Sequence, residues 1–240
     1  MEIIEKIKKK ANNLYEHRQP VIAFTGDSVT QGCFELYVKE EGVVKPVFNS
    51  SECYAEKDKK IFALLFPETN IMIVNAGISG NHAAIGSKRL RTDVLAHNPD
   101  LTVVCYGLND SNDKEAGLEV YKSSLRKIFK DLKDAGSEVI FMTPNMCTNR
   151  IDYSIKEKEI QNAAQRVMKT VNEGWLDKYI EEAKKVCDEE KVPVCDCYSI
   201  WKKLDNSGVD ITSMLSNKLN HPIKEMHWMF AYELVKTMFN

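Results

Sequence analysis

The sequence lacks any uninterrupted apolar run that approaches the roughly 20 residues of a membrane-spanning helix. It also lacks the apolar core of a signal peptide near its start, because MEIIEKIKKK is mostly charged. The residues Ile3, Ile4, Ile7 and Leu14 instead predict one face of an amphipathic first helix. We therefore expect a cytoplasmic protein.

The chain also has no large excess of positive or negative charge. The 33 Lys and Arg residues nearly balance the 35 Asp and Glu residues, and the formal net charge is -2. No global field favours nucleic acid or an anionic membrane, so we expect neither as a partner. The basic run Lys8–Lys10 is interpreted as the solvated face of the first helix. Nothing in the sequence indicates an oligomeric state.

Metal and cofactor motifs are also missing. The seven cysteines include no CxxC pair, and Cys195 and Cys197 have a poor spacing for two ligands of one zinc ion. No HExxH or GxGxxG occurs, and GNHAAIGSK at 80–88 has the wrong spacing for a phosphate-binding loop. We predict no metal and no cofactor, and we expect reduced, mostly buried thiols.

The sequence does contain short apolar runs that alternate with helical patterns. This order predicts an α/β sandwich with a parallel sheet and right-handed crossovers, formed by a single domain over residues 1–240. The expected strands are Val21–Phe24, Ile71–Val74, Leu101–Cys105, Val139–Met142 and Val192–Cys195. The expected helices after the first are Tyr54–Phe66, Ala83–His97, Glu115–Ala135, Ile155–Lys191 and Ile223–Met238.

Two segments of this pattern carry further expectations. The long helical segment is predicted to break near Gly174 and to begin at a capping box of Ser154 and Glu157. The stretch Cys33–Ser51 has no clear period and is expected to be irregular. Its apolar residues either form a modest acyl pocket or simply pack: Phe34, Tyr37, Val43, Val44 and Phe48.

Polar loops that contain glycine follow the first three expected strands. They are GDS at 26–28, NAGISGNH at 75–82 and YGLNDSN at 106–112. Ligands of open parallel sheets bind outside the carboxyl ends of the strands, so the three loops are expected to face one crevice. Ser28 is therefore a candidate nucleophile, although glycine and Asn or Asp also suit ordinary turns. Two acids are interpreted as loop-shaping acceptors of nearby N–H groups: Asp27 and Asp110.

A nucleophilic serine needs a base, and the five histidines differ in context. His221 lies in LNHP, where Pro222 can open the last helix and leave the imidazole over the sheet edge. His82, in the second polar loop, either touches substrate or is simply solvated. The other three are expected to be solvated, structural or packing residues: His17, His97 and His227.

The stretch Gly26-Asp27-Ser28, together with Gly80, Asn109 and His221, resembles the conserved blocks of the SGNH, or GDSL, hydrolases. The blocks follow in the same order across nearly the whole chain. The resemblance implies a flavodoxin-like three-layer α/β/α sandwich whose five-stranded parallel sheet has the order 2-1-3-4-5. It also implies a serine ester hydrolase in which Ser28 attacks and His221 moves the proton. The oxyanion hole implied is the backbone N–H groups of Ser28 and Gly80 and the side chain of Asn109.

The chain departs from the family at one position. The family usually has Asp three residues before the histidine, where this sequence has Lys218, which cannot accept the imidazole N–H. We therefore expect a Ser–His dyad of modest activity if no carboxylate stabilises the imidazolium. The residue that orients His221 stays open among Asn217, Asn220, Asp205 and Asp210.

The expected substrate is an ester with a short acyl group, with O-acetyl carbohydrate as the leading candidate, because no large apolar cap for lipid chains is evident. The resemblance indicates reaction class better than substrate. One alternative is a catalytically weak carbohydrate-binding protein on the same scaffold, which the Lys218 departure favours. Another is an acyltransferase that uses the same residues with an acceptor other than water.

Overall fold

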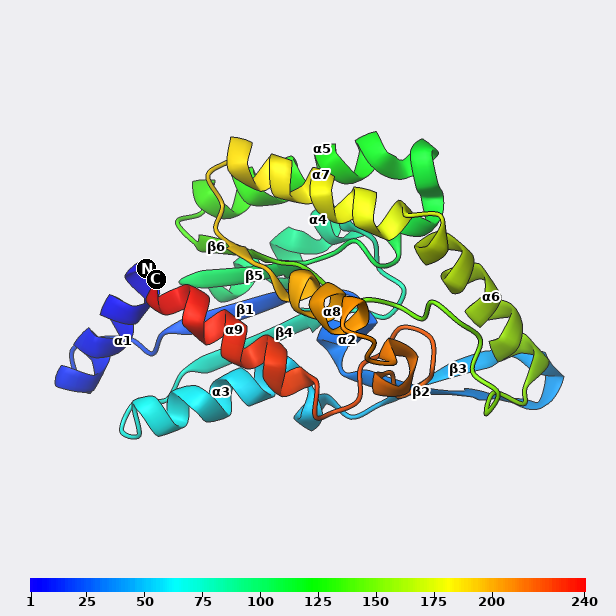
Figure 1. Cartoon of the computed structure of the whole chain (residues 1–240). Helices are drawn as coiled ribbons and strands as arrows, with labels where there is room; N and C mark the ends of the chain where they lie inside the picture. Colours follow the sequence, from blue (N-terminus) through cyan, green and yellow to red (C-terminus); the bar gives the residue numbers. More distant parts are fainter.

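A five-stranded parallel sheet lies between two layers of helices in the computed structural model (Figure 1). The structure describes residues 1–240, apart from the side chain of Glu41. The order across the sheet is β4-β1-β5-β6-β7, which is the expected 2-1-3-4-5 order, so the predicted flavodoxin-like sandwich is confirmed. Its strands are β1 (Val21–Gly26), β4 (Met72–Gly77), β5 (Leu101–Cys105), β6 (Glu138–Met142) and β7 (Val194–Cys195).

Side chains of the sheet point alternately to its two faces, and each face has its own apolar core. Ile22 and Phe24 pack toward one helix layer, while Ala23 packs toward the other. The first layer contains α1 (Glu2–Asn12), α3 (Tyr54–Leu65), α8 (Cys197–Asn206) and α9 (His227–Phe239). The second contains α4 (Ala83–Asp93), α5 (Lys114–Asp134) and α7 (Trp175–Glu189).

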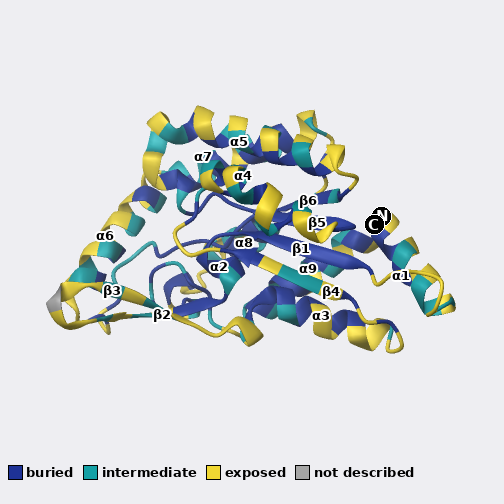
Figure 2. Ribbon diagram, turned by 180° about the vertical axis from the view of Figure 1, so that it is seen from behind, coloured by how far each residue is buried: buried dark blue, intermediate teal, exposed yellow. Residues whose placement is uncertain are grey.

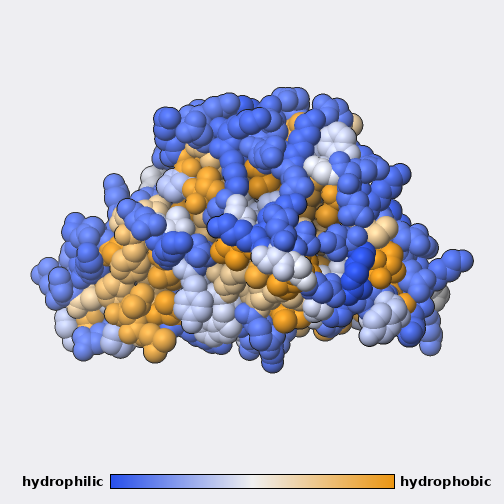
Figure 3. Space-filling model, viewed as in Figure 1, coloured by the Kyte–Doolittle hydropathy of each residue, from blue (hydrophilic) through white to orange (hydrophobic). Residues whose placement is uncertain are grey.

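Burial follows from this layering. The middle strands are buried along their length, whereas the edge strand β4 is partly exposed (Figure 2). Apolar surface also gathers over α3 and its surroundings (Figure 3), where Leu64 and Leu65 are exposed. Among the described residues, no helix combines the length and the apolar composition that crossing a bilayer requires.

The long helical segment was only partly predicted. The break at Gly174 is confirmed, because this residue has φ 78° between α6 (Lys158–Asn172) and α7. The capping box is wrong. The helix α6 begins four residues after Ser154, whose hydroxyl donates to the carboxylate of Asp152 at 2.6 Å instead.

The stretch expected to be irregular forms an antiparallel hairpin of β2 (Cys33–Val38) and β3 (Val44–Phe48). Apolar and polar residues alternate only weakly along this hairpin, because α6 covers only part of one of its faces. Leu36, Val38 and Val44 pack beside Ile160 and Ala164 of α6. Cys33 and Phe34 at the start of β2 are buried, and most of the other side chains of the two strands are exposed. The short preceding helix is α2 (Ser28–Gln31).

Two helix ends also differ from expectation. Pro222 does not open the last helix, which begins at His227; it pairs with Leu215 in an isolated antiparallel bridge. The first helix stops at Asn12, so Leu14 lies beyond it and is exposed. His221 is therefore held by a loop that folds back on itself.

Candidate active site

The carboxyl ends of β1, β4 and β5 meet at one edge of the sheet. Gly26, the last residue of β1, is in register with Gly77 of β4 and Cys105 of β5. The backbone N–H of Ile78 donates to the carbonyl of Gly26 at 3.1 Å, which joins the second polar loop to the first. The three polar loops expected to face one crevice therefore start from adjacent points.

Ser28 begins a single turn of helix directly after β1. Asp27 caps this turn, because its carboxylate accepts the backbone N–H of Val29 at 2.9 Å. Burial raises the pKa of Asp27 to about 7. The turn packs so closely on β4 that a Cβ on Gly77 would lie 2.4 Å from the backbone nitrogen of Gln31. Asp27 shapes the loop as expected, and the close packing fixes the position of Ser28.

His221 reaches Ser28 from a segment 193 residues further along the chain. The distance from His221 Nε2 to Ser28 Oγ is 2.9 Å, and both side chains are buried. The loop around the histidine is closed by a bond of 2.7 Å from the N–H of Ser216 to the carbonyl of His221. Burial lowers the pKa of His221 to about 4, so the imidazole is neutral at pH 7.

Of the four candidates for orienting His221, Asn217 alone contacts the ring: its Nδ2 lies 2.9 Å from His221 Nδ1. Asn220 contacts Asn217 instead, through its Oδ1 at 3.0 Å. The carboxylate of Asp210 pairs with Arg150, and that of Asp205 accepts from the Asn149 amide. These two acids therefore face other partners.

The position of the family's usual acid is turned away from the ring. Lys218 has a left-handed backbone, with φ 58°. Its ammonium donates to the carbonyl of Ser213 at 3.1 Å. The lysine therefore does not take the place of the missing carboxylate.

The expected oxyanion residues lie on the two loops beside Ser28. Gly80 has φ 76°, and open space surrounds the place where its Cβ would be. The amide of Asn109 donates to the carbonyl of Asn81 at 3.0 Å, which fastens the third loop to the second. Asp110 strengthens this junction by accepting the N–H groups of Ala83 at 2.9 Å and Gly107 at 3.1 Å. Burial raises the pKa of Asp110 to about 6.

Arg89 and Asn145 support the site, and the sequence analysis missed both. The guanidinium of Arg89 donates to the carbonyls of Ala76 at 2.6 Å and Gly26 at 3.1 Å, and so ties two strand ends together. The amide of Asn145 donates to the carbonyl of Asn220 at 2.9 Å, which steadies the histidine loop. Neither residue lies in a recognisable motif, so no local signal distinguishes them from ordinary polar residues.

The other histidines are not brought to Ser28. His17 and His97 are exposed. His227 is fully buried at the start of α9, where its Nδ1 accepts the N–H of Tyr54 at 3.1 Å, as expected of a packing residue. His82 is half-buried and lies 4.0 Å from the carboxylate of Asp113.

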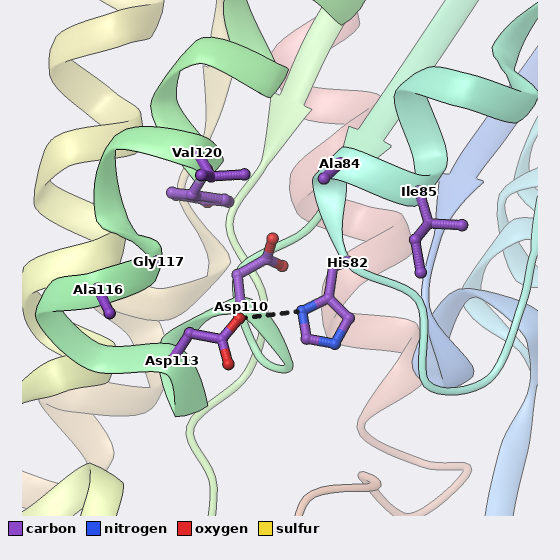
Figure 4. Close-up of a pocket in the computed structure, with 9 residues that line it drawn as sticks. His82, Ala84, Ile85, Asp110, Asp113, Ala116, Gly117 and Val120 are labelled. Carbon is purple, nitrogen blue, oxygen red and sulfur yellow. Dashed lines mark ion pairs between the residues drawn. The ribbon is translucent and has the colours of Figure 1, made fainter.

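Two cavities are lined by residues from the segments that carry the site, although neither is lined by Ser28 or His221. One of about 410 Å³ is lined by His82, Asp110 and Asp113, among others, and lies beside the second and third polar loops (Figure 4). Another of about 380 Å³ includes Phe34 and Val47 of the hairpin. Among the apolar hairpin residues considered in the sequence, Phe34 lines this cavity, whereas Tyr37, Val43 and Phe48 are exposed.

Comparison with known proteins gives a family and a fold. The sequence model of the GDSL-like Lipase/Acylhydrolase family matches residues 24–229. An acetylxylan esterase of Geobacillus stearothermophilus is 29% identical over 132 residues, which span 51% of this chain and 58% of that relative.

Two solved structures match the fold of nearly the whole chain, although their sequence identity to it is low. The acetylxylan esterase Axe2 of Geobacillus stearothermophilus has a TM-score of 0.67 at 20% identity, covering 91% of this chain and 94% of its own. A two-domain esterase active on acetylated mannans has a TM-score of 0.68 at 16% identity, covering 99% of this chain and 52% of its own. At these identities the likeness shows the fold alone.

Proposed function

Since the chain belongs to the GDSL-like lipase/acylhydrolase family, we propose that it is a serine ester hydrolase that removes short acyl groups from carbohydrate. The observation that carries this proposal is the 2.9 Å contact between Ser28 Oγ and His221 Nε2. A hydroxyl and a neutral imidazole at this distance form the minimal pair for nucleophilic acyl transfer.

In the proposed reaction, Ser28 Oγ attacks the ester carbonyl carbon while His221 takes its proton. The resulting oxyanion accepts hydrogen bonds from the backbone N–H groups of Ser28 and Gly80 and from the amide of Asn109. The tetrahedral intermediate then expels the alcohol, which receives the proton from His221, and the acyl group stays on Ser28. Water repeats the sequence and releases the acid.

Acetylated carbohydrate is the substrate class that the relatives favour. One relative is named an acetylxylan esterase, and another is described as active on acetylated mannans. Four charged residues are among those that line the cavity of about 380 Å³ beside the hairpin, but neither Ser28 nor His221 lines it. These charged residues are Glu35, Glu52, Lys224 and Glu225.

The test is release of acetate from 4-nitrophenyl acetate and from acetylated xylo-oligosaccharides. The parent protein is expected to turn over both, and Ser28→Ala to lose at least about 10³-fold in kcat. Acetyl esters are expected to react faster than butyryl and octanoyl esters. Equal turnover in Ser28→Ala and the parent would contradict the proposal.

Two alternatives have distinct outcomes in the same experiments. Oligosaccharide binding without any turnover is the result expected of a carbohydrate-binding protein. An acetylated product formed when free xylose is added is the result expected of an acyltransferase. Both use the scaffold and residues proposed above, so product analysis separates them.

A cytoplasmic location and a single domain over residues 1–240 belong to the same proposal. The location is supported by the seven cysteines, all of which are buried as free thiols. The single domain is supported by the continuous sheet, to which segments from residue 21 to residue 195 contribute.

A further inference from the structure

The side-chain amide of Asn217 makes more hydrogen bonds than any other group around His221. Its Oδ1 accepts the backbone N–H groups of Leu219, Asn220 and His221, each at 3.0 Å. Its Nδ2 faces the Oδ1 of Asn220 at 3.0 Å and the Nδ1 of His221 at 2.9 Å. Asn217 itself is buried.

This network fixes which end of the amide faces the imidazole. Three backbone donors point at one atom of Asn217, so that atom is the carbonyl oxygen. Turning the amide over would place an NH₂ group against three N–H groups and leave all of them without an acceptor. The atom beside His221 Nδ1 is therefore a donor.

A donor beside Nδ1 determines the tautomer of the neutral ring. Nδ1 must accept the hydrogen bond, so the single ring proton lies on Nε2. Nε2–H then donates to Ser28 Oγ across the 2.9 Å contact. In this state Nε2 has no lone pair free for the proton of Ser28.

We propose that Asn217 is a positioning residue that holds His221 in the tautomer with its proton on Nε2, so that the resting site is mostly unable to activate Ser28. The proposal rests on the ester hydrolase function proposed above. Turnover then proceeds through the minor fraction of molecules whose ring carries its proton on Nδ1. The apparent rate is reduced by that fraction, which we expect to be about a tenth to a hundredth.

Among the side chains that the structure describes, none that is charged shifts the pKa of His221. Besides Ser28 and Asn217, the ring is influenced by the backbone carbonyl of Phe34, which raises the pKa of His221 less than burial lowers it. His227 of α9 is also close enough to interact, and burial lowers its own pKa to about 3, so it is neutral at pH 7.

The substitution Asn217→Asp replaces the amide donor beside His221 Nδ1 with a carboxylate acceptor. One carboxylate oxygen keeps the three backbone N–H groups, which hold the acid ionised. The other oxygen accepts a hydrogen bond from Nδ1–H, so the ring proton stays on Nδ1 and Nε2 is free to act as a base. The side chain of Asn220 can turn its amide over and donate where it now accepts.

The first test reads the tautomer directly and needs no substrate. Ring ¹⁵N spectra of histidine-labelled protein at pH 7, assigned through His221→Gln, are expected to show the His221 proton on Nε2. In Asn217→Asp it is expected on Nδ1. A parent ring with its proton on Nδ1 would overturn the proposal.

The second test is kinetic and uses 4-nitrophenyl acetate. Asn217→Asp is expected to raise kcat about 10- to 100-fold, with KM changed less than about threefold. As the pH is lowered, the rate of Asn217→Asp is also expected to fall at a higher pH than the rate of the parent. The reason is that the new carboxylate stabilises the imidazolium and so raises the pKa of His221. A folded Asn217→Asp variant without this gain overturns the proposal.

Lys218→Asp is the matched control. It adds a carboxylate at the family's usual position, but the side chain there points toward Ser213 rather than the ring. We expect its kcat to stay within about threefold of the parent, and an equal gain in both variants would show a general effect of charge. If neither parent nor variant hydrolyses esters while the spectra show the proton on Nε2, the proposed function fails and the tautomer assignment stands.

Discussion

The carboxyl of Asp58 gives a quantitative prediction about stability. The residue lies in α3, one turn from Tyr54 and one turn from Phe62, and is fully buried. Neither carboxyl oxygen has a hydrogen-bond partner among the described residues. Burial raises the pKa of Asp58 well above its usual range, so the folded protein holds a proton that the unfolded chain releases above about pH 3.8.

The sign of the pH dependence follows from this proton. The folded state binds more protons than the unfolded state above about pH 3.8, so the stability contributed by this group falls as pH rises through the window below its raised pKa. Asp58→Asn removes the ionisation and keeps the shape. Within that window, each pH unit is expected to change the difference between variant and parent by about 1.4 kcal/mol. This corresponds to about 3–6 °C in Tm for a chain of this size.

The assay is thermal unfolding of parent and variant between pH 5 and pH 8. The advantage of Asp58→Asn is expected to grow toward pH 8. Asp188→Asn, at an exposed position of α7, is the control and is expected to shift stability by less than about 0.5 kcal/mol at every pH. An Asp58→Asn variant that is less stable at pH 8, or a difference that does not change with pH, would refute the reasoning.

Three further predictions concern the site. Asn109→Ala is expected to lower kcat by about 10²–10³ with little change in KM, measured with 4-nitrophenyl acetate, because the proposed oxyanion hole loses one donor; a rise in KM alone would contradict this. Gly77→Ala is expected to destabilise the protein by about 1–3 kcal/mol in urea unfolding, because its Cβ would meet the Gln31 backbone at 2.4 Å; an unchanged midpoint would contradict that packing. Arg89→Met is expected to lower both Tm and kcat, because the strand ends it joins then lack their shared donor; loss of neither would show that the guanidinium is dispensable.

The sheet and the meeting of the polar loops could be predicted from the sequence for a physical reason. Strands buried on both faces must be continuously apolar, and the chain turns polar where each strand reaches the sheet edge. Ser28 and Asn109 follow two such strands, and Gly80 follows the partly exposed edge strand β4, so their neighbourhood depends on the order of the strands.

The details around His221 could not be predicted, because they depend on side-chain direction within a short loop. Asn217 and Asn220 are both amides close to His221 in the sequence, and only the folded loop shows that Asn217 is the one that faces the ring. The hairpin was missed for a related reason. Since α6 buries only part of one face of the hairpin, the sequences of β2 and β3 show no clear alternation of apolar and polar residues.

The central claim is that Ser28 carries the acyl group during turnover. The most direct measurement is the intact mass of the protein, followed by peptide mapping, after reaction with a fluorophosphonate ester. The account predicts one adduct, on Ser28, formed at the same rate at which esterase activity is lost, and no adduct in Ser28→Ala. Complete loss of activity with Ser28 unmodified, or labelling of another residue that tracks the loss, would contradict it.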